Sequence, residues 1–464
     1  MTNSTGWSSK LFNQYHRLGN PCCIYPAPEQ FQQNISAFER FSALRNSNKT
    51  QRSLTLNVNI PFSANACYYG TNKNIVTKDR SRSTAYLHAL EQEIRLVAQH
   101  IDSQQPVEQL HFGGGTPTFL NPNELRQLMG CLKDNFNISS NNFTQYSIDI
   151  DPRETDWSTM GVLRDIGFNR VNIEVQGLDP KVQRAINRLQ TYEQTQNIVE
   201  AARTLQFRTV SISLIYGLPK QTPHSFANAL ADVIKLMPDR ITVRGFKHQP
   251  TKYPIQQRIN AADLPSAHCI EKMLRDALQQ LNRAGYTYIG MDHFALADDD
   301  FASAQEDGTL QYGIQGYSTC ANCDTLGFGV SAISQIGELY YQNTHDLNAY
   351  QTACNNRQLP TAQGMLCNTD EQIRRSVIQA LACQFTVDFS NLERNYAINA
   401  RAYFHALWPQ LEQMQDAGLL SVNAQLLKMT QQGRLFTQAV CQLFADADYA
   451  AADNVIKIPI TQAI

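Results

Sequence analysis

The chain has 464 residues, of which 42% are hydrophobic and 17% charged, and its formal net charge is −2 at pH 7. This length can bury a large core, so we expect two or three domains. The small net charge excludes a strong general attraction to nucleic acid or anionic membrane, and no apolar run is long enough to cross a bilayer. The eleven cysteines are scattered and odd in number, and the start lacks a secretion signal. We therefore expect reduced thiols and a cytoplasmic location.

Strand-like and helix-like segments alternate from residue 53 to about residue 250. The first strand, 54–60, alternates apolar and polar residues, which predicts one buried face and one polar face with Asn57 and Asn59. Further strands are predicted at 107–112, 145–151, 170–176, 209–217 and 240–246. Amphipathic helices are predicted between them. Six strand–helix units in series predict a parallel sheet, either barrel-like or doubly wound, with ligands at the carboxyl ends of the strands.

Two loops follow the carboxyl ends of predicted strands. The first, "IPFSANACYYGTNKNIVT" (60–77), contains the single cysteine Cys67, and the second is the glycine turn 113–115. Because the carboxyl ends of parallel strands meet at one edge, we expect both loops to face the same site. By itself the glycine turn is equally well explained as a tight connection between a strand and a helix.

The second half of the chain is predicted to be mainly helical toward its end. From about residue 368 the pattern is helical, and the order helix, strand, helix near the end predicts a small winged-helix-like module. Arg374 and Arg375 lack a surrounding basic stripe, so no nucleic-acid partner is expected. The predicted domains are an N-terminal arm, a barrel, a barrel extension and a helical domain, at 1–52, 53–260, 261–365 and 366–464.

Short motifs lie in a characteristic order along nearly the whole chain. They include "IPF" (60–62), "HFGGGTPTFL" (111–120), "DPRE" (151–154), "LIYGLPKQTP" (214–223), "IGMDHFA" (289–295), "QGYST" (315–319) and "LGFGVSAIS" (326–334). In these motifs the chain resembles the oxygen-independent coproporphyrinogen III oxidases, or dehydrogenases, which are radical S-adenosylmethionine enzymes of haem biosynthesis. The resemblance implies an α/β fold with an incomplete (βα)6, TIM-like barrel, an N-terminal arm over the barrel mouth and a C-terminal helical domain.

The first loop departs from the pattern of this family. Family members have Cys-x3-Cys-x2-Cys there, and the three thiolates hold a 4Fe–4S cluster whose fourth iron is left open for S-adenosylmethionine. Aligning "IPF" places Ser63, Cys67 and Gly70 at the three positions, and a further family cysteine falls on Asn72. Serine is a poor substitute for a thiolate and glycine has no ligand atom. We therefore predict that this loop holds neither the cluster nor another metal.

Cysteines elsewhere leave alternatives open. Cys22 and Cys23 are interpreted as buried or incidental thiols of the N-terminal arm, with help in cluster ligation as the alternative. Cys320 and Cys323 form the only close pair with a two-residue spacing. A metal site there needs two more ligands, so a reduced pair in a loop is the plainer interpretation.

Other departures fall on the same site. The family's tyrosine and histidine on the first strand correspond to Asn57 and Asn59, which keep hydrogen bonding but lose reach and basicity. An acidic residue of the family corresponds to Ser213, and a glutamate is shortened to Asp149. The family motif Arg-Tyr-Thr-Ser-Tyr-Pro becomes "PCCIYP" (21–26), which removes an arginine suited to a propionate.

Several residues match family positions that contact S-adenosylmethionine. The resemblance assigns cofactor contacts to Gly114, Gly115, Thr116, Asp149, Gln176 and Arg188. A tight turn, a satisfied polar residue and a surface salt bridge are the alternatives for the glycines, Gln176 and Arg188. Lys247 replaces a small residue, and its ammonium group would compete with a sulfonium ligand, which disfavours this cofactor.

The face expected to meet a tetrapyrrole is better preserved. The resemblance makes Asp292, His293, Gln315 and Tyr317 the candidates on the substrate side. His293 is a candidate haem ligand, although a hydrogen-bonded structural histidine is the more common role for such a residue.

We predict a protein of coproporphyrinogen III oxidase ancestry that has lost the cluster and its radical chemistry. It would retain binding of a porphyrin, haem, nucleoside or S-adenosylmethionine ligand, or regulate an intact relative. The alternatives are an active enzyme whose cluster has unusual ligands, and a protein-interaction scaffold with an empty barrel.

Overall fold

The computed structural model of the chain describes residues 8–16, 18, 25–33, 35–71, 74–139 and 144–446. Cys22, Cys23 and Asn72, which the sequence comparison with the family singles out, lie outside these residues. No described helix is both long enough and apolar enough to cross a membrane.

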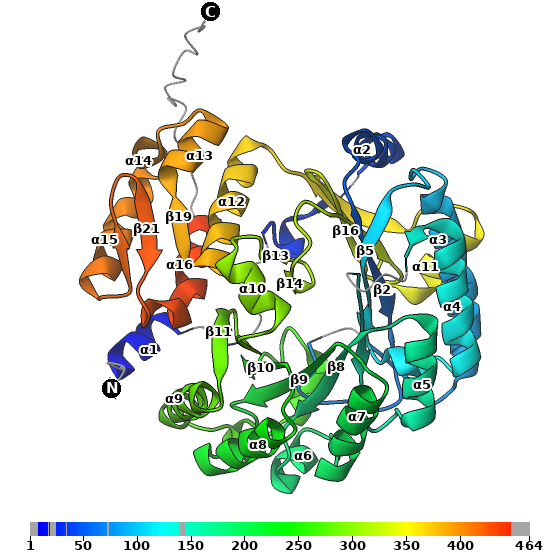
Figure 1. The fold of residues 1–464 in the computed structure, drawn as a ribbon, viewed down its shortest axis with the longest axis horizontal. Coiled ribbons are helices and arrows are strands. Elements are labelled where there is room, and N and C mark those ends of the chain that lie inside the picture. Colours follow the sequence, from blue (N-terminus) through cyan, green and yellow to red (C-terminus); the bar gives the residue numbers. More distant parts are fainter. Residues whose placement is uncertain are drawn as a thin grey trace, which may run out of the picture.

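A curved, mostly parallel sheet forms the centre of the molecule (Figure 1). All six predicted barrel strands are present, and each pairs in parallel with the next. They are β2 (Leu54–Ile60), β5 (Pro106–Gly114), β7 (Gln145–Ile150), β8 (Arg170–Gln176), β9 (Thr209–Tyr216) and β10 (Arg240–Gly245). The sheet does not close on itself, because antiparallel strands extend it at both edges instead of pairing with each other. The predicted incomplete barrel is therefore confirmed.

Amphipathic helices cover the outer face of this sheet (Figure 1). They are α3 (Ser81–Ala98), α4 (Pro122–Asn135), α5 (Trp157–Ile166), α7 (Tyr192–Thr204), α8 (Pro223–Lys235) and α9 (Ala267–Arg283). The four apolar residues of β2, from Leu54 to Ile60, are at most 1% exposed. Alternation thus buries one face of β2 and points Asn57 and Asn59 to the inside of the barrel, where the site is expected.

A seventh parallel strand comes from a segment for which the sequence predicts only a loop. β15 (Asp324–Phe328) pairs in parallel with β2, on the side of β2 away from β5. Beyond it β16 (Ile333–Ile336), β17 (Leu339–Asn343) and β18 (Thr361–Leu366) continue the sheet in antiparallel order. At the opposite edge, the hairpin of β11 (Tyr286–Gly290) and β12 (His293–Leu296) pairs with β10. Short apolar runs do not identify their partner strands, because pairing joins residues far apart in the sequence.

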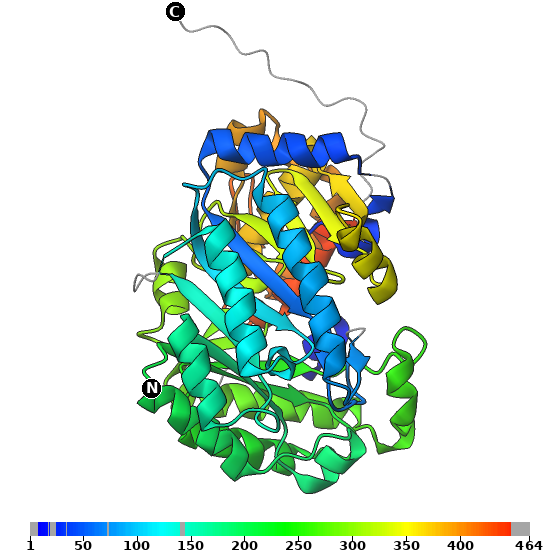
Figure 2. The ribbon, with the colours of Figure 1, turned by 90° about the vertical axis from the view of Figure 1, so that its right-hand side faces the viewer.

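The described part of the N-terminal arm is divided between the two ends of the barrel. α1 (Ser9–Tyr15) packs against α9, where Ser9 donates to Glu271, and His16 Nε2 is 2.9 Å from the hydroxyl of Tyr216 at the carboxyl end of β9. α2 (Ala37–Thr50) lies at the other end, where the strands begin (Figure 2). That the N-terminal arm covers the barrel mouth stays a prediction.

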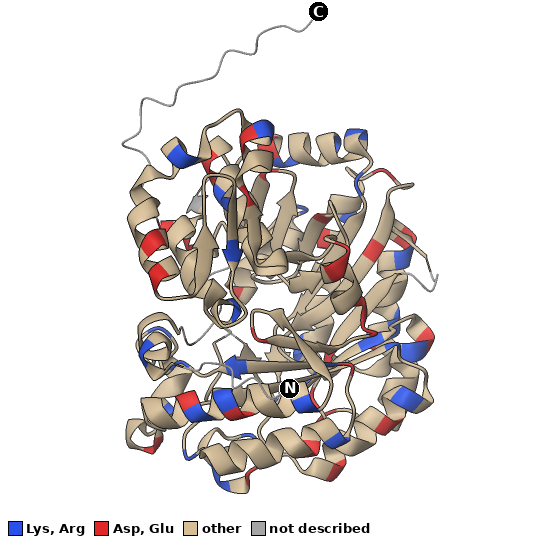
Figure 3. Cartoon of the chain, turned by 60° about the vertical axis from the view of Figure 1, so that its left-hand side comes forward, with Lys and Arg blue, Asp and Glu red and all other residues tan. Residues whose placement is uncertain are grey.

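The C-terminal region is helical with a small sheet, as predicted. α12 (Thr369–Gln384), α13 (Phe389–Tyr396), α15 (Trp408–Asp416) and α16 (Thr437–Asp446) surround an antiparallel sheet. Its strands are β19 (Thr386–Asp388), β20 (Leu420–Val422) and β21 (Leu426–Met429). One continuous cluster of buried apolar side chains runs from the barrel strands to α16. In the view of Figure 3, basic and acidic residues are interspersed on the outer helices.

Candidate functional site

The loop after β2 brings the three family ligand positions to the barrel mouth. Ser63 is buried in β3 (Phe62–Ser63), which pairs with β4 (Ile75–Val76). Gly70 closes a turn by donating its N–H to the carbonyl of Cys67 at 3.2 Å. The three positions thus offer one hydroxyl, one thiol and no third side-chain ligand.

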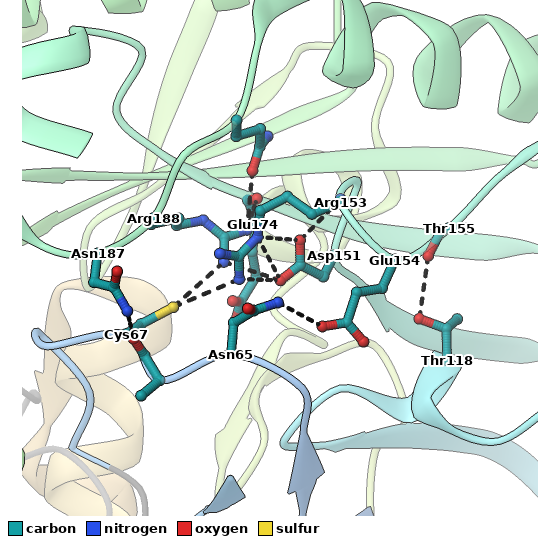
Figure 4. Close-up of polar contacts among 12 residues, drawn as sticks. Asn65, Cys67, Thr118, Asp151, Arg153, Glu154, Thr155, Glu174, Asn187 and Arg188 are labelled. Carbon is teal, nitrogen blue, oxygen red and sulfur yellow. Dashed lines mark hydrogen bonds and ion pairs between the residues drawn. The ribbon is translucent and has the colours of Figure 1, made fainter. Parts of the chain in front are cut away.

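Two guanidinium groups lie beside the Cys67 thiol (Figure 4). Arg153 and Arg188 reach its sulfur at 3.6 and 3.8 Å. Both also pair with the carboxylate of Asp151, at 2.6 and 3.1 Å. Burial opposes ionisation of Asp151, but the hydrogen bond from Arg153 and the charge of Arg188 outweigh it and lower its pKa. The thiol therefore faces a buried, hydrogen-bonded ion cluster with more positive than negative side chains.

These residues do not fit a cluster held by three thiolates. Among the residues that the structure describes, His, Cys, Asp and Glu ligand atoms come close enough to hold a metal only at Glu108, Cys320 and Cys323, outside this loop. Soft anionic thiolates are what an iron–sulfur cluster requires, and neither Ser63 nor Gly70 supplies one.

The glycine turn after β5 packs against the same loop. The N–H groups of Gly115 and Thr116 donate to the carbonyls of Ile60 and Phe62, each at 2.7 Å. A side chain at Gly115 would collide with the carbonyl of Phe62, and Gly114 has φ +104°. Close approach of two backbones therefore accounts for these glycines in the described structure, and a cofactor contact for Gly114, Gly115 and Thr116 stays a prediction.

The interior of the barrel holds a polar network around Asp149. Asn172 donates to its Oδ1 at 3.1 Å, and Nε2 of His111 is 3.6 Å from its Oδ2. Burial raises the pKa of Asp149, but the charge and hydrogen bond of His111 bring it below its usual range. The predicted site residue Asp149 is thus ionised inside the barrel.

Several buried polar atoms of the barrel find no partner in the described part of the chain. They are Nδ2 and Oδ1 of Asn57 and Oε1 of Gln176. Gln176 is the last residue of β8 and lies at a shift in strand register. Its φ is +67°, a backbone conformation that residues other than glycine rarely adopt. Buried polar groups are normally satisfied, so a polar ligand is the expected partner of these atoms. They are compatible with the polar groups of S-adenosylmethionine as well as with other polar ligands.

Two cations lie at or just beyond the end of β10. Arg244 and Lys247 are exposed, and neither has an ion pair with another described residue. The charge of Arg244 nevertheless contributes to the lowered pKa of Asp149, and it opposes the rise that burial causes in the pKa values of Glu174 and Asp292. Arg244 therefore lies among the carboxyl groups of the barrel, where it is available to an anionic ligand.

The four substrate-side candidates do not form one cluster. The rings of His293 and Tyr317 are in edge contact at 5.2 Å, and the Tyr317 hydroxyl donates to the carbonyl of Ala382 at 2.7 Å. Nδ1 of His293 is 2.6 Å from the carbonyl of Met291, and burial lowers its pKa to about 3. Gln315 is exposed at the tip of the hairpin formed by β13 (Gln311–Gly313) and β14 (Gly316–Ser318). These contacts of His293 are those of a hydrogen-bonded structural histidine, which is the alternative to a haem ligand that the sequence analysis gives.

Asp292 lines a pocket between the barrel rim and the C-terminal domain. Tyr288, Arg434 and His16 also line it. Burial raises the pKa of Asp292 to about 7, against the opposing effect of Arg244. Asp292 therefore stays largely protonated up to about neutral pH.

Sequence reasoning missed the role of Arg153 and of Glu174. Arg153 belongs to the "DPRE" motif that supports the family resemblance, so the signal was present in the sequence. Glu174 lies on the inner face of β8, and its pKa is raised by burial. Alternation along β8 was the only available signal for Glu174.

Comparisons with known proteins agree over nearly the whole chain. Residues 60–233 match the radical SAM superfamily, and residues 368–436 match the HemN C-terminal domain. A Pseudomonas aeruginosa protein named oxygen-independent coproporphyrinogen III oxidase is 50% identical over 444 residues, which are 96% of each chain. An Escherichia coli protein of the same name is 38% identical over 439 residues, 94% of this chain and 95% of the relative.

A solved structure supports the same assignment. It is described as coproporphyrinogen III oxidase (HemN) from Escherichia coli, a radical SAM enzyme, and superposes with a TM-score of 0.90 at 37% identity. The superposition covers 95% of this chain and 99% of the other. The predicted fold class, a partial barrel with a C-terminal helical domain, is therefore confirmed.

Proposed function

The chain belongs to the oxygen-independent coproporphyrinogen III oxidase family of the radical SAM superfamily, and we propose that it binds a polycarboxylate tetrapyrrole at the barrel mouth without building the family cluster from its own loop. The observation that carries this proposal is the loop itself: Cys67 is its only thiol, and Arg153 and Arg188 lie beside that thiol. A cluster that depends on three thiolates has no adequate ligand set there.

Charge and hydrogen bonding support an anionic ligand in the barrel. Arg244 and Lys247 form no ion pair with other described residues, and both lie at or just after the end of β10. Carboxylates of a tetrapyrrole pair well with guanidinium and ammonium groups. The unpartnered amide group of Asn57 and the unpartnered Oε1 of Gln176 supply further polar contacts inside the barrel.

The first experiment tests ligand binding. We expect coproporphyrin III, a stable probe for this ligand class, to bind saturably and to change its absorbance and fluorescence on titration with the chain. Arg244→Ala should weaken binding at least about tenfold, because a charge-assisted hydrogen bond contributes about 1.5–3 kcal/mol. Arg208→Ala is the matched control, since Arg208 pairs with Asp300 at the end of the barrel where the strands begin, away from the mouth. A titration without saturation would contradict the proposal and favour a protein-interaction scaffold.

A second candidate is the oxidative decarboxylation named for the relatives. The full-length match to proteins named coproporphyrinogen III oxidase supports this candidate at least as strongly as the loop supports the first. It requires thiolates from outside the loop, either from Cys22 and Cys23 or from a partner protein.

Anaerobic reconstitution with iron and sulfide distinguishes the two candidates. The first predicts iron well below four atoms per chain and no reductive cleavage of S-adenosylmethionine. The second predicts a stoichiometric cluster with cleavage, and loss of both in the Cys22→Ser, Cys23→Ser double variant if these thiols are the missing ligands.

A further inference from the structure

Two cysteines and a glutamate come together at the base of the barrel, where the parallel strands begin. Cys320 and Cys323 flank a two-residue turn that leads directly into β15. Glu108 lies near the start of β5, more than 200 positions earlier in the sequence. Sequence reasoning considered the cysteine pair alone and judged that it lacked further ligands; the fold supplies a third.

The three ligand atoms are close enough to share one cation. Sγ of Cys320, Sγ of Cys323 and a carboxylate oxygen of Glu108 all lie within 4.8 Å of one another. Cys320 Sγ is 3.2 Å from Oε2 of Glu108, and the two Cα atoms of the cysteines are 6.0 Å apart. The structure places the two sulfurs within bonding distance, as a disulfide, so the reduced pair that the sequence predicts is not what the structure records.

A β-bulge points Glu108 toward the cysteines. Leu54 of β2 pairs with Val107, and the next residue, Thr55, pairs with Gln109, so Glu108 has no partner on β2. Such an extra residue commonly redirects a side chain. Ser53 then donates to Oε1 of Glu108 at 2.6 Å, which leaves Oε2 facing Cys320.

The charges at this site favour a cation. Two thiolates and a carboxylate carry three negative charges, and Glu108 forms no ion pair within the described residues. Three negative charges this close together require a positive charge between them. A divalent metal ion supplies that charge, and zinc accepts both thiolate and carboxylate ligands in tetrahedral sites.

We propose that the reduced chain binds one zinc ion through Cys320, Cys323 and Glu108, with water in the fourth position. Ser53 positions the carboxylate, as outer hydrogen-bond partners of metal ligands commonly do. The ion joins β5 to the turn before β15 across the intervening β2. That turn is already attached to neighbouring strands, since Ser318 donates to Gln109 at 2.9 Å and Gln145 donates to Thr319. The site is independent of the proposed function at the mouth.

The experiment uses the full chain, reduced and handled without oxygen. We expect one zinc per chain by elemental analysis after removal of free metal. Substituting cobalt should give a thiolate-to-cobalt charge-transfer band and the visible absorption of tetrahedral cobalt. Cys320→Ser and Cys323→Ser should each abolish the stoichiometric ion, and Glu108→Gln should weaken binding at least tenfold. Ser53→Ala should weaken it about tenfold, as expected for a residue that orients a ligand.

Matched controls separate this site from general effects. Cys269→Ser removes another partly exposed free thiol, and Glu306→Gln neutralises another exposed glutamate. Both should bind zinc as the unmodified chain does.

Three outcomes would overturn the proposal. They are a fully reduced chain that binds no stoichiometric zinc, zinc that persists in the Cys320→Ser, Cys323→Ser double variant, and unchanged affinity in Glu108→Gln. The cobalt spectrum of the unmodified chain tests the ligand set even if a variant fails to fold.

Discussion

The two ends of the barrel differ in how their cysteines are surrounded. At the mouth, one thiol remains where the family pattern has three, and two arginines lie beside it. At the base, Cys320 and Cys323 lie beside the carboxylate of Glu108, which only the tertiary structure brings near. If both proposals hold, family descent alone does not locate a metal site in this chain, because ligands are defined by their proximity in space.

The largest expected effect comes from restoring thiols at the mouth. In the Ser63→Cys, Gly70→Cys double variant, anaerobic reconstitution should raise bound iron toward about four atoms per chain, since three thiolates then face one site. The backbone of Gly70 is outside the left-handed region, and an added Cβ would lie 3.3 Å from the carbonyl oxygen of Cys67, so a side chain fits there after a small shift. Adding Cys67→Ser should remove the gained iron. If the unmodified chain already holds as much iron as the double variant, the proposal that the loop at the mouth cannot hold the cluster is contradicted.

A second test removes a buried charge beside Cys67. Arg188 is 1% exposed, and it pairs with Asp151 and donates to the backbone of Glu174. Arg188→Ala should lower the free energy of unfolding by about 3 kcal/mol, because it leaves buried acceptors and part of a buried carboxylate uncompensated. Denaturant unfolding measures the loss.

The control for that test is an exposed ion pair. Arg203 pairs with Asp239 at 2.9 Å on the surface, so Arg203→Ala should cost less than about 1 kcal/mol. Equal losses in the two variants would show that the ion cluster at Cys67 is no more important to stability than a surface pair.

The smallest expected effect is a pH dependence at the barrel rim. Burial raises the pKa of Asp292 to about 7, whereas an unfolded aspartate titrates near 4. The native state therefore binds more protons between these values, and its stability falls as pH rises from about 4 to about 7. Asp292→Asn does not titrate and suits the φ of 66° at this position. Three pKa units represent about 4 kcal/mol, but Asp292 is partly exposed and solvent screening reduces the effect. Relative to the unmodified chain, the variant should therefore gain roughly 1–2 kcal/mol of stability by pH 8 and nothing near pH 4.

Thermal unfolding across this pH range measures the gain. Asp298→Asn is the control, since Asp298 is exposed in the same region. A constant difference between variant and unmodified chain at every pH would refute a titration of Asp292 in this window.

Local sequence patterns determined a large part of the fold. Alternation along 54–60 and the strand–helix order up to residue 246 predicted all six barrel strands, because side-chain periodicity is a property of a few consecutive residues. Ordered motifs identified the family, and the identities of Ser63, Cys67 and Gly70 already indicated that the cluster loop is incomplete. These conclusions required no knowledge of which distant segments are in contact.

Contacts between distant segments were decided only by the tertiary structure. Periodicity did not reveal that β15 pairs with β2, that α2 lies at the base, or that Arg153 and Arg188 lie beside Cys67. The most consequential case is Glu108. A bulge in β5 and a turn more than 200 residues away bring its carboxylate beside Cys320, where we propose that it is a metal ligand. The spacing of residues along the chain can predict a site whose ligands are close in sequence. Where the ligands come from different strands, strand pairing across the sheet sets the distances between them.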